Sequence, residues 1–263
     1  MSKLIDIGVN FTSSNFKLDL STVIEQAVLH DIETMIVTGS DVADSVQAIE
    51  LCQKYPKYLK STVGIHPHHA DDFTNEDLQK IQELSSNKCI VALGECGLDY
   101  NRNYSSKNAQ LYCFEAQLEY ASGSNYPVFL HQRDAHTDFL NILKKYRKDL
   151  SNVVVHCFTG TQNELEDYLK LDTYIGITGW ICDERRGYHL HDLLCKIPEN
   201  RLLVETDAPY LLPRSLKPKP KSRRNEPKYL PYIVQVIANI LNKDYDTIAD
   251  ETTRAAQKFF NLE

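Results

Sequence analysis

Short runs of apolar residues alternate with longer amphipathic stretches along most of this 263-residue chain. The short runs are rich in β-branched residues, which is typical of buried β-strands. The longer stretches repeat apolar residues every three or four positions, as in Val23, Ile24, Ala27 and Val28, and this spacing predicts amphipathic helices. We therefore expect eight strands, at Leu4–Gly8, Thr34–Thr38, Leu59–Val63, Ile90–Gly94, Val128–His131, Val153–His156, Tyr174–Thr178 and Leu202–Glu205.

The alternation of strands and helices predicts βαβ units, and therefore a parallel sheet covered by helices. Eight such units in a chain of this length favour an α/β fold of the (β/α)8 TIM barrel type. We find no internal repeat and no convincing linker, so we expect a single domain over residues 1–263. A helical region at about Leu230–Leu241 and Thr247–Phe260 is expected to end the chain.

Polar side chains stand at or just after the ends of most predicted strands. In a barrel the carboxyl ends of all strands meet on one rim, where active sites are built. In an open sheet the same ends would be spread along a line, too far apart for one site. The sequence therefore predicts a shared site formed by Asn10, His66, Glu95, His131, His156 and Asp207.

Four of these residues predict a metal site: Glu95, His131, His156 and Asp207. A buried strand rarely ends in a charged or imidazole group that has no partner. Two imidazoles and two carboxylates would bind a divalent cation and leave positions for water and substrate. Such a cation would activate a water molecule as the nucleophile and stabilise charge on a phosphoryl oxygen. For any one of these residues alone, a satisfied rim side chain is the simpler interpretation.

Two carboxylates and one arginine complete the predicted site. Asp207 is expected to accept the proton of the attacking water as well as to bind the metal. Glu205 lies two positions earlier, so strand alternation predicts that it points the same way, as a second ligand or as a group that orients a histidine. Arg133 suits a substrate phosphate; the alternative for its guanidinium is an ion pair with Asp134 or Asp138.

Charge is distributed unevenly along the chain. The net charge is −7, so no global basic field attracts nucleic acid. The segment Arg214–Lys228 holds seven Lys/Arg and one Glu, which makes it +6 and the remaining residues −13. Its prolines predict a loop after the eighth strand. This loop, with Arg223–Arg224, and the pair Arg185–Arg186 could attract a phosphate backbone locally.

The sequence shows neither a signal peptide nor an apolar stretch long enough for a transmembrane helix, so we expect no membrane association. The seven cysteines are scattered, and no CxxC motif occurs. This usage predicts reduced thiols and a cytoplasmic location.

Five sequence stretches resemble, in order, the motifs of the TatD family of metal-dependent nucleases, a branch of the amidohydrolase-like barrels. The resemblance implies a Mg²⁺-dependent deoxyribonuclease that often acts 3′→5′ on single strands, with the four residues above as metal ligands. It also favours His66 as a substrate contact, whereas His68 and His69 are expected to be loop residues bonded to backbone. The stretches are GIHPH (Gly64–His68), GECGLDY (Gly94–Tyr100), HQRDAH (His131–His136), HCFTG (His156–Gly160) and ETDAPYLLP (Glu205–Pro213).

The first predicted strand departs from the family pattern. Most members begin with Asp-x-His-x-His, but here Gly8 and Asn10 stand at the two histidine positions. Gly8 has no ligand atom in a side chain, and Asn10 offers only a neutral carbonyl oxygen, so two bound ions are not implied. Ligand chemistry alone favours Zn²⁺ or Mn²⁺ for the two remaining histidines, and Mg²⁺ rests on the resemblance.

We therefore predict a metal-dependent, monomeric exonuclease that hydrolyses phosphodiester bonds of single-stranded DNA, with RNA as a second substrate. One alternative is an amidohydrolase acting on a small cyclic amide or ester, for which the arginines would serve no purpose. A second alternative is a non-catalytic metal-binding barrel, against which the four retained ligands argue.

Overall fold

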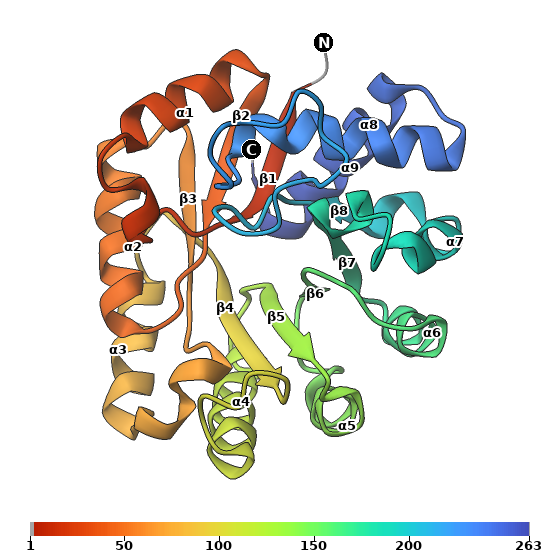
Figure 1. The fold of residues 1–263 in the computed structure, drawn as a ribbon. Coiled ribbons are helices and arrows are strands. Elements are labelled where there is room, and N and C mark those ends of the chain that lie inside the picture. The colour runs from red at the N-terminus through yellow and green to blue at the C-terminus, as the bar shows by residue number, and fades with distance from the viewer. Residues whose placement is uncertain (1–2, 263) are drawn as a thin grey trace. The chain divides into compact units, whose positions relative to one another are not determined.

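The computed structural model describes residues 3–262, and its strands form one eight-stranded sheet in which neighbours along the chain are neighbours in the sheet (Figure 1). The strand pairs are parallel. Backbone bridging of Val9 with Ala208 joins the first strand to the segment after the last. The fold is a (β/α)8 TIM barrel, and all eight predicted strands are present. Their bounds are β1 Leu4–Val9, β2 Ile32–Val37, β3 Leu59–Val63, β4 Ile90–Asp99, β5 Val128–Arg133, β6 Val153–Val155, β7 Tyr174–Ile177 and β8 Leu202–Val204.

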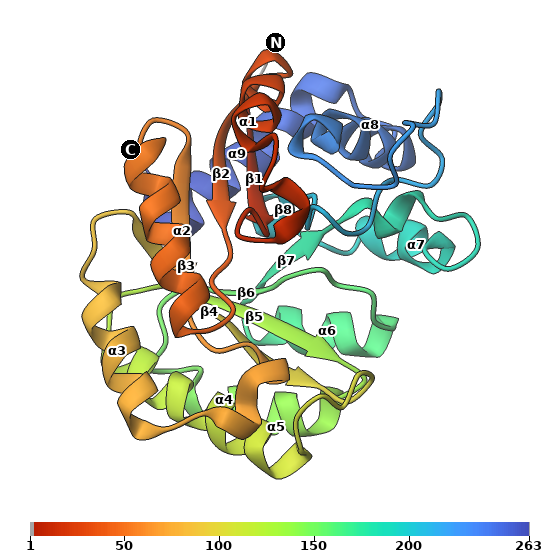
Figure 2. The same ribbon diagram turned by 60° about the vertical axis from the view of Figure 1, so that its left-hand side comes forward.

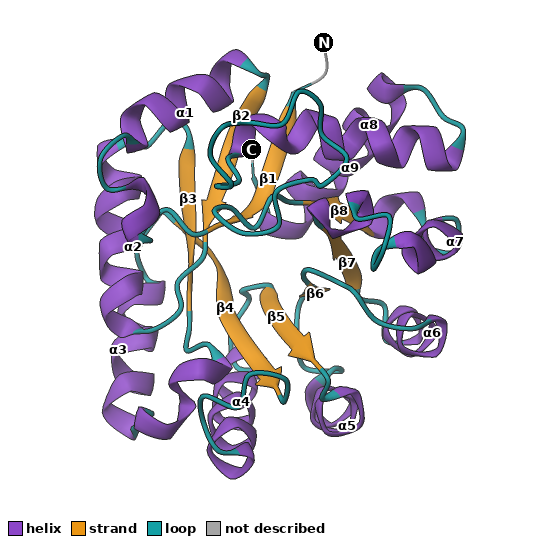
Figure 3. Ribbon diagram, viewed as in Figure 1, coloured by secondary structure: helices purple, strands orange, loops and turns teal. Residues whose placement is uncertain are grey.

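Helices alternate with the strands along the chain, as the amphipathic pattern predicts (Figure 3). Several begin at a residue whose side chain accepts a backbone N–H, such as Asp41 before α2 and Thr74, which forms a capping box with Asp77, before α3. The helices are α1 Leu20–Leu29, α2 Val42–Lys54, α3 Asn75–Ser85, α4 Lys107–Ser122, α5 His136–Tyr146, α6 Gln162–Lys170, α7 His191–Leu194, α8 Leu230–Leu241 and α9 Tyr245–Phe260.

The chain divides into two compact units. The terminal unit comprises Met1–Val37, Cys157–Leu165 and Ile175–Glu263, and the central unit comprises Thr38–His156 and Glu166–Tyr174. In the terminal unit, α9 packs on β1 and β8 through a buried apolar face. In the central unit, α4 packs beside α5, where the rings of Phe114 and Phe139 stack 5.2 Å apart. The expectation of a single domain stays a prediction.

Strand β4 is longer than its sequence predicts. We expected it to end at Gly94, but it continues to Asp99 after a register shift between Leu93 and Cys96. Gly94 and Gly97 have φ angles of +125° and +145°, and a Cβ atom at either would overlap a carbonyl oxygen of β5. For Gly97 that oxygen belongs to His131. The glycines therefore allow β4 to approach β5 closely on both sides of Glu95.

Two simpler expectations can be compared with the structure. All seven cysteines are free thiols in the structure. Among the helices within residues 3–262, none combines the length and the apolar character needed to cross a membrane.

Candidate metal centre and substrate site

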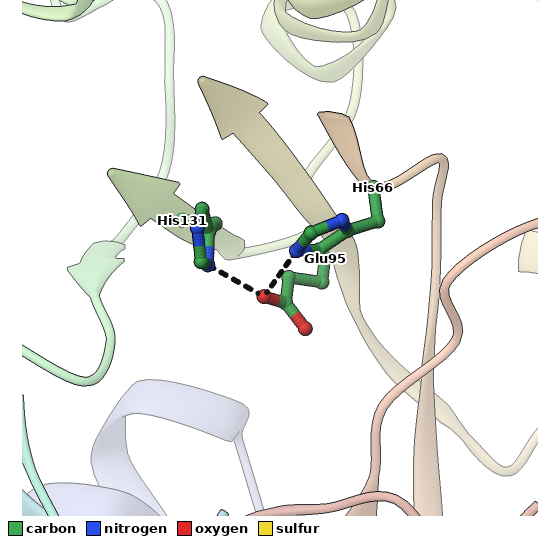
Figure 4. Close-up of side chains that lie close together, drawn as sticks. All are labelled: His66, Glu95 and His131. Atoms are coloured by element: carbon green, nitrogen blue, oxygen red, sulfur yellow. Dashed lines mark ion pairs between the residues drawn. The ribbon is translucent and has the colours of Figure 1, made fainter. Parts of the chain in front are cut away.

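Three imidazoles surround one carboxylate oxygen in the central unit. Oε1 of Glu95, in β4, lies 2.9 Å from Nδ1 of His131 in β5 and 2.8 Å from Nε2 of His156, which follows β6. It also lies 3.3 Å from Nε2 of His66, which follows β3. Figure 4 shows the rings of His66 and His131 on opposite sides of this carboxylate, both directed at the same oxygen. The structure thus brings together four of the six residues that the sequence predicts to share a site.

Burial and the neighbouring side chains shift the pKa values of this cluster in opposite directions. Burial alone would raise the pKa of Glu95, but His156, His66 and His131 together hold it well below its usual range. Burial alone would lower the pKa of His131, but its interactions with Asp99 and Glu95 raise it overall. Glu95 is therefore a buried carboxylate that stays ionised.

These side chains fit a divalent cation. Nδ1 of His131 and Nε2 of His156 lie 3.4 Å apart, and both face the same oxygen of Glu95. The other ring nitrogen of His131, Nε2, is buried; it lies 3.6 Å from Oδ2 of Asp99, too far for a hydrogen bond, and has no hydrogen-bond partner within residues 3–262. Two imidazoles and an ionised carboxylate converging in this way form a donor set for a divalent metal ion once the facing nitrogens give up their protons.

His66 has a different hydrogen-bonding role. Its ligand atom lies within 4.8 Å of those of Glu95 and His131, so distance alone would make it a third ligand. However, its Nδ1 accepts the backbone N–H of His68 at 3.1 Å, so neutral His66 carries its proton on Nε2. Burial lowers the pKa of His66 to about 4, which keeps the ring neutral near pH 7. We therefore interpret His66 as a hydrogen-bond donor rather than a metal ligand.

The sequence analysis missed a buried carboxylate, Asp99, at the end of β4. Its Oδ2 lies 2.8 Å from Nε2 of His68 and 3.6 Å from Nε2 of His131. Its Oδ1 accepts the backbone N–H groups of Asn101 and Arg102, both at 2.9 Å. Burial would raise the pKa of Asp99, but its hydrogen bonds hold it well below its usual range. The available signal was strand alternation, which places residues 95, 97 and 99 on one face.

The expected backbone partners of the two loop histidines were wrong. The ring of His68 is bonded to the carboxylate of Asp99 rather than to backbone. His69 faces Asp41, with 4.0 Å between Nδ1 and a carboxylate oxygen. A lone sequence motif cannot distinguish these partners, because they are distant along the chain.

In the terminal unit, Asp207 is held by the first strand. Its N–H donates to the carbonyl of Gly8 at 2.9 Å, and its Oδ1 accepts Nδ2–H of Asn10 at 2.9 Å. The amide of Asn10 also lies 3.2 Å from the carbonyl of Ala208. Asn10 therefore orients the carboxylate predicted to act in catalysis.

The terminal unit holds two further buried carboxylates: Glu205, two positions before Asp207, and Asp6, which is bonded to Thr206. Glu205 is fully buried, and its Oε1 accepts the N–H of Cys157 at 2.6 Å. Because β8 ends at Val204 and Asp207 has a φ of +53°, strand alternation does not apply to this pair. Asp6 lies 2.6 Å from the hydroxyl of Thr206, and burial raises its pKa to about 8.

The arginines predicted to bind phosphate differ in their partners. Arg133 makes no side-chain hydrogen bond or ion pair with any residue from 3 to 262, so the expected ion pair with Asp134 or Asp138 is not observed. Arg185 and Arg186 both bind Asp183 at 3.1 Å. Of these three, only Arg133 is available to a ligand without breaking an ion pair.

An exposed aromatic side chain lies beside the histidine cluster. Tyr104 is 64% exposed, and its ring centre lies 4.7 Å from that of His68. The ring of His68 in turn lies 4.2 Å from that of His66. The structure therefore places an exposed aromatic side chain next to the site.

Comparison with known proteins shows one consistent similarity. The family model for TatD related DNases matches residues 5–261. A protein named 3′-5′ ssDNA/RNA exonuclease TatD, from Erwinia tasmaniensis, is 48% identical over 259 residues, which is 98% of this chain and 100% of that protein. A hydrolase of the TatD family from Entamoeba histolytica superposes with a TM-score of 0.90 at 26% identity, covering 99% of both chains. A TatD homologue from Escherichia coli K12 gives 0.89 at 25% identity, covering 99% of this chain and 98% of the other.

Proposed function

Because this chain belongs to the TatD related DNase family, we propose that it is a metal-dependent 3′→5′ exonuclease of single-stranded DNA, with RNA as a second substrate. Family membership confirms the predicted class, a hydrolase of phosphodiester bonds, and removes the basis for the amidohydrolase alternative. The observation that carries the proposal is the buried, ionised carboxylate of Glu95 enclosed by imidazoles. The name of the Erwinia tasmaniensis relative supports the polarity and the substrate.

The cation would be held by Glu95, His131 and His156, whose donor atoms converge. Asp207 is proposed as the further ligand on the basis of the family resemblance. A bound cation would lower the pKa of a water molecule and neutralise charge on the phosphoryl oxygen. Imidazole ligands favour Mn²⁺ or Zn²⁺, whereas the resemblance supports Mg²⁺, and we propose Mg²⁺.

The remaining side chains would bind and orient the substrate. His66 is proposed to donate its Nε2–H to a phosphate oxygen, since its other nitrogen is already used by the backbone. Arg133 is proposed to bind the same phosphate with its unpaired guanidinium.

The carboxylates have separate proposed roles. Asp207, oriented by Asn10, would accept a proton from the attacking water. Glu205 would help to position His156, because it accepts the backbone N–H of Cys157, the residue that follows His156. Asp99 would orient His131 through the ring nitrogen that faces away from Glu95.

The test is hydrolysis of single-stranded DNA labelled at either end, with Mg²⁺, Mn²⁺ or Zn²⁺ supplied after treatment with EDTA. We expect the strand to shorten stepwise from the 3′ end, with mononucleotides as an early product. A closed circular single strand is the matched control, because it has no end. Equal cleavage of the circle would contradict exonuclease action, and undiminished activity in EDTA would contradict metal dependence.

We propose further that the protein is a monomer of the cytoplasm. The seven free thiols support a reducing compartment. Sedimentation of the purified protein at several concentrations tests the monomer; a concentration-dependent mass would contradict it.

A further inference from the structure

An irregular segment between β8 and α8 concentrates positive charge in the terminal unit. We call Arg214–Arg224 the cationic loop; it belongs to the blue segment that precedes α8 in Figure 2. Its exposed residues include Lys217, Lys219, Lys221 and Arg223. Within residues 3–262 none of these four has a hydrogen-bond or ion-pair partner in its side chain. The loop therefore presents four free cations within seven positions of a chain that is acidic overall.

The arginines at the two ends of this loop are paired, and so they fix its position. Arg214 binds Glu184 at 2.7 Å at one end. At the other end, Arg224 binds Asp19 with both guanidinium NH groups, at 2.9 and 2.7 Å, and donates to the carbonyl of Asn15 at 2.7 Å. The ends are thus anchored by ion pairs, whereas the cations between them are not used by the fold.

The base of the loop is attached beside Asp207. Asn225 is fully buried, and its N–H donates to the carbonyl of Pro209 at 3.0 Å. Its side chain donates to the carbonyl of Thr206 at 2.9 Å. These two acceptors lie on either side of Asp207 in the chain. No residue of the loop is more than five positions from an anchored end, which limits its reach to about 17 Å.

The composition of the loop indicates what it would bind. Like charges that stand close together repel each other, and a polyanion that binds them relieves this repulsion. Pro218 and Pro220 restrict the backbone, so less conformational entropy is lost on binding. The loop contains no aromatic residue on which a base could stack. Lysine ammonium groups bind phosphate as point charges without reading base edges.

We propose that the cationic loop binds the phosphate backbone of the substrate strand a few nucleotides from the bond that is cut, without regard to base sequence. The identity of the substrate rests on the proposed function. The loop would then increase affinity for strands long enough to reach it, and the added affinity would weaken as salt rises.

The test compares a quadruple variant, K217Q/K219Q/K221Q/R223Q, with the wild type. For a 20-nucleotide strand at low salt we expect kcat/KM, relative to that for a dinucleotide, to fall at least tenfold. Equilibrium binding of the same strand in EDTA should show a salt slope shallower by about 0.7 for each phosphate that the variant no longer neutralises, hence by up to ~3. A second variant that replaces the three lysines by arginine should retain the wild-type slope.

The matched control removes four exposed lysines elsewhere, in K88Q/K144Q/K148Q/K258Q; within the described residues 3–262 their side chains have no hydrogen-bond or ion-pair partner. It should behave like the wild type. If the control loses as much affinity as the loop variant, the effect is one of net charge and the proposal is wrong. An unchanged length preference and salt slope in the loop variant would also overturn it. The two proposals can fail separately. If the protein cuts no DNA but its binding of the 20-nucleotide strand depends on the loop, the proposed function is refuted and the role of the loop is supported.

Discussion

Opposite charge states distinguish two buried carboxylates of the central unit, Glu95 and Asp99, from one of the terminal unit, Asp6. In the central unit, Glu95 and Asp99 are buried against imidazoles, and their pKa values lie well below the usual range. In the terminal unit, Asp6 is equally buried, but its partners are the hydroxyl and N–H groups of Thr206, and its pKa rises to about 8. Burial is common to all three, so the kind of partner decides the charge. An ionised carboxylate can bind a cation, whereas a protonated one serves as a neutral hydrogen-bonding group.

The largest expected effect comes from removing one of the proposed metal ligands. Glu95→Gln, His156→Ala and Asp207→Asn should each reduce turnover more than 100-fold, since loss of a group that only orients a ligand already costs roughly 10–100-fold. Hydrolysis rates and circular dichroism should be measured side by side. A folded variant with the wild-type rate would refute the role of that residue.

A somewhat smaller effect is expected when the second ionised carboxylate is neutralised. Asp99→Asn leaves His131 in place but weakens its orientation, so metal affinity or activity should fall about 10- to 100-fold. The measurement is activity as a function of metal concentration, and excess metal should restore part of the rate. Asp149→Asn, on an exposed carboxylate, is the matched control. Equal behaviour of the two variants would show that Asp99 has no part in the site.

The protonated carboxylate of the terminal unit should affect stability instead. Between pH 6 and pH 7.5 the unfolded chain has Asp6 ionised while the folded chain keeps the proton, so stability falls as pH rises. The wild type should therefore lose about 2 kcal/mol relative to Asp6→Asn, which has no proton to lose, or roughly a factor of 30 in the unfolding equilibrium. Urea unfolding at both pH values measures the difference. Parallel pH dependence in the two proteins would place the pKa of Asp6 outside this window.

The smallest predicted effect concerns the exposed ring beside the histidine cluster. Tyr104→Ala should raise KM for single-stranded DNA about fivefold if one base stacks on this ring, at the lower end of the ~1–3 kcal/mol per base expected for stacking. Tyr104→Phe keeps the ring and should retain the wild-type KM. An equal rise in KM in both variants would mean that the hydroxyl group, rather than stacking on the ring, binds the substrate.

Local patterns in the sequence were sufficient to locate all eight strands, because each apolar run and each amphipathic stretch records burial within a few residues. The same local signal ended β4 too early, because it does not show that Gly94 and Gly97 allow the strand to continue in close contact with β5. Asp99 was missed for this reason.

Partners that are distant along the chain could not be predicted. The bond from Asn10 to Asp207 joins positions 197 residues apart, and nothing near either residue indicates it. Adjacent arginines were treated alike in the sequence, whereas in the structure Arg224 is paired and Arg223 has no side-chain partner within residues 3–262. Pairing of a side chain is a property of tertiary structure, which composition does not record.

The attachment of the cationic loop at both ends has an evolutionary consequence. Because Asn225 fixes the base of the loop beside Asp207, residues between the two anchors can change without moving β8. Doubling the length of a flexible loop costs only about 0.6 kcal/mol in closure entropy. Related enzymes could therefore lengthen, shorten or recharge this segment and so change how long they remain on a strand, while the residues that cut the bond stay under separate selection.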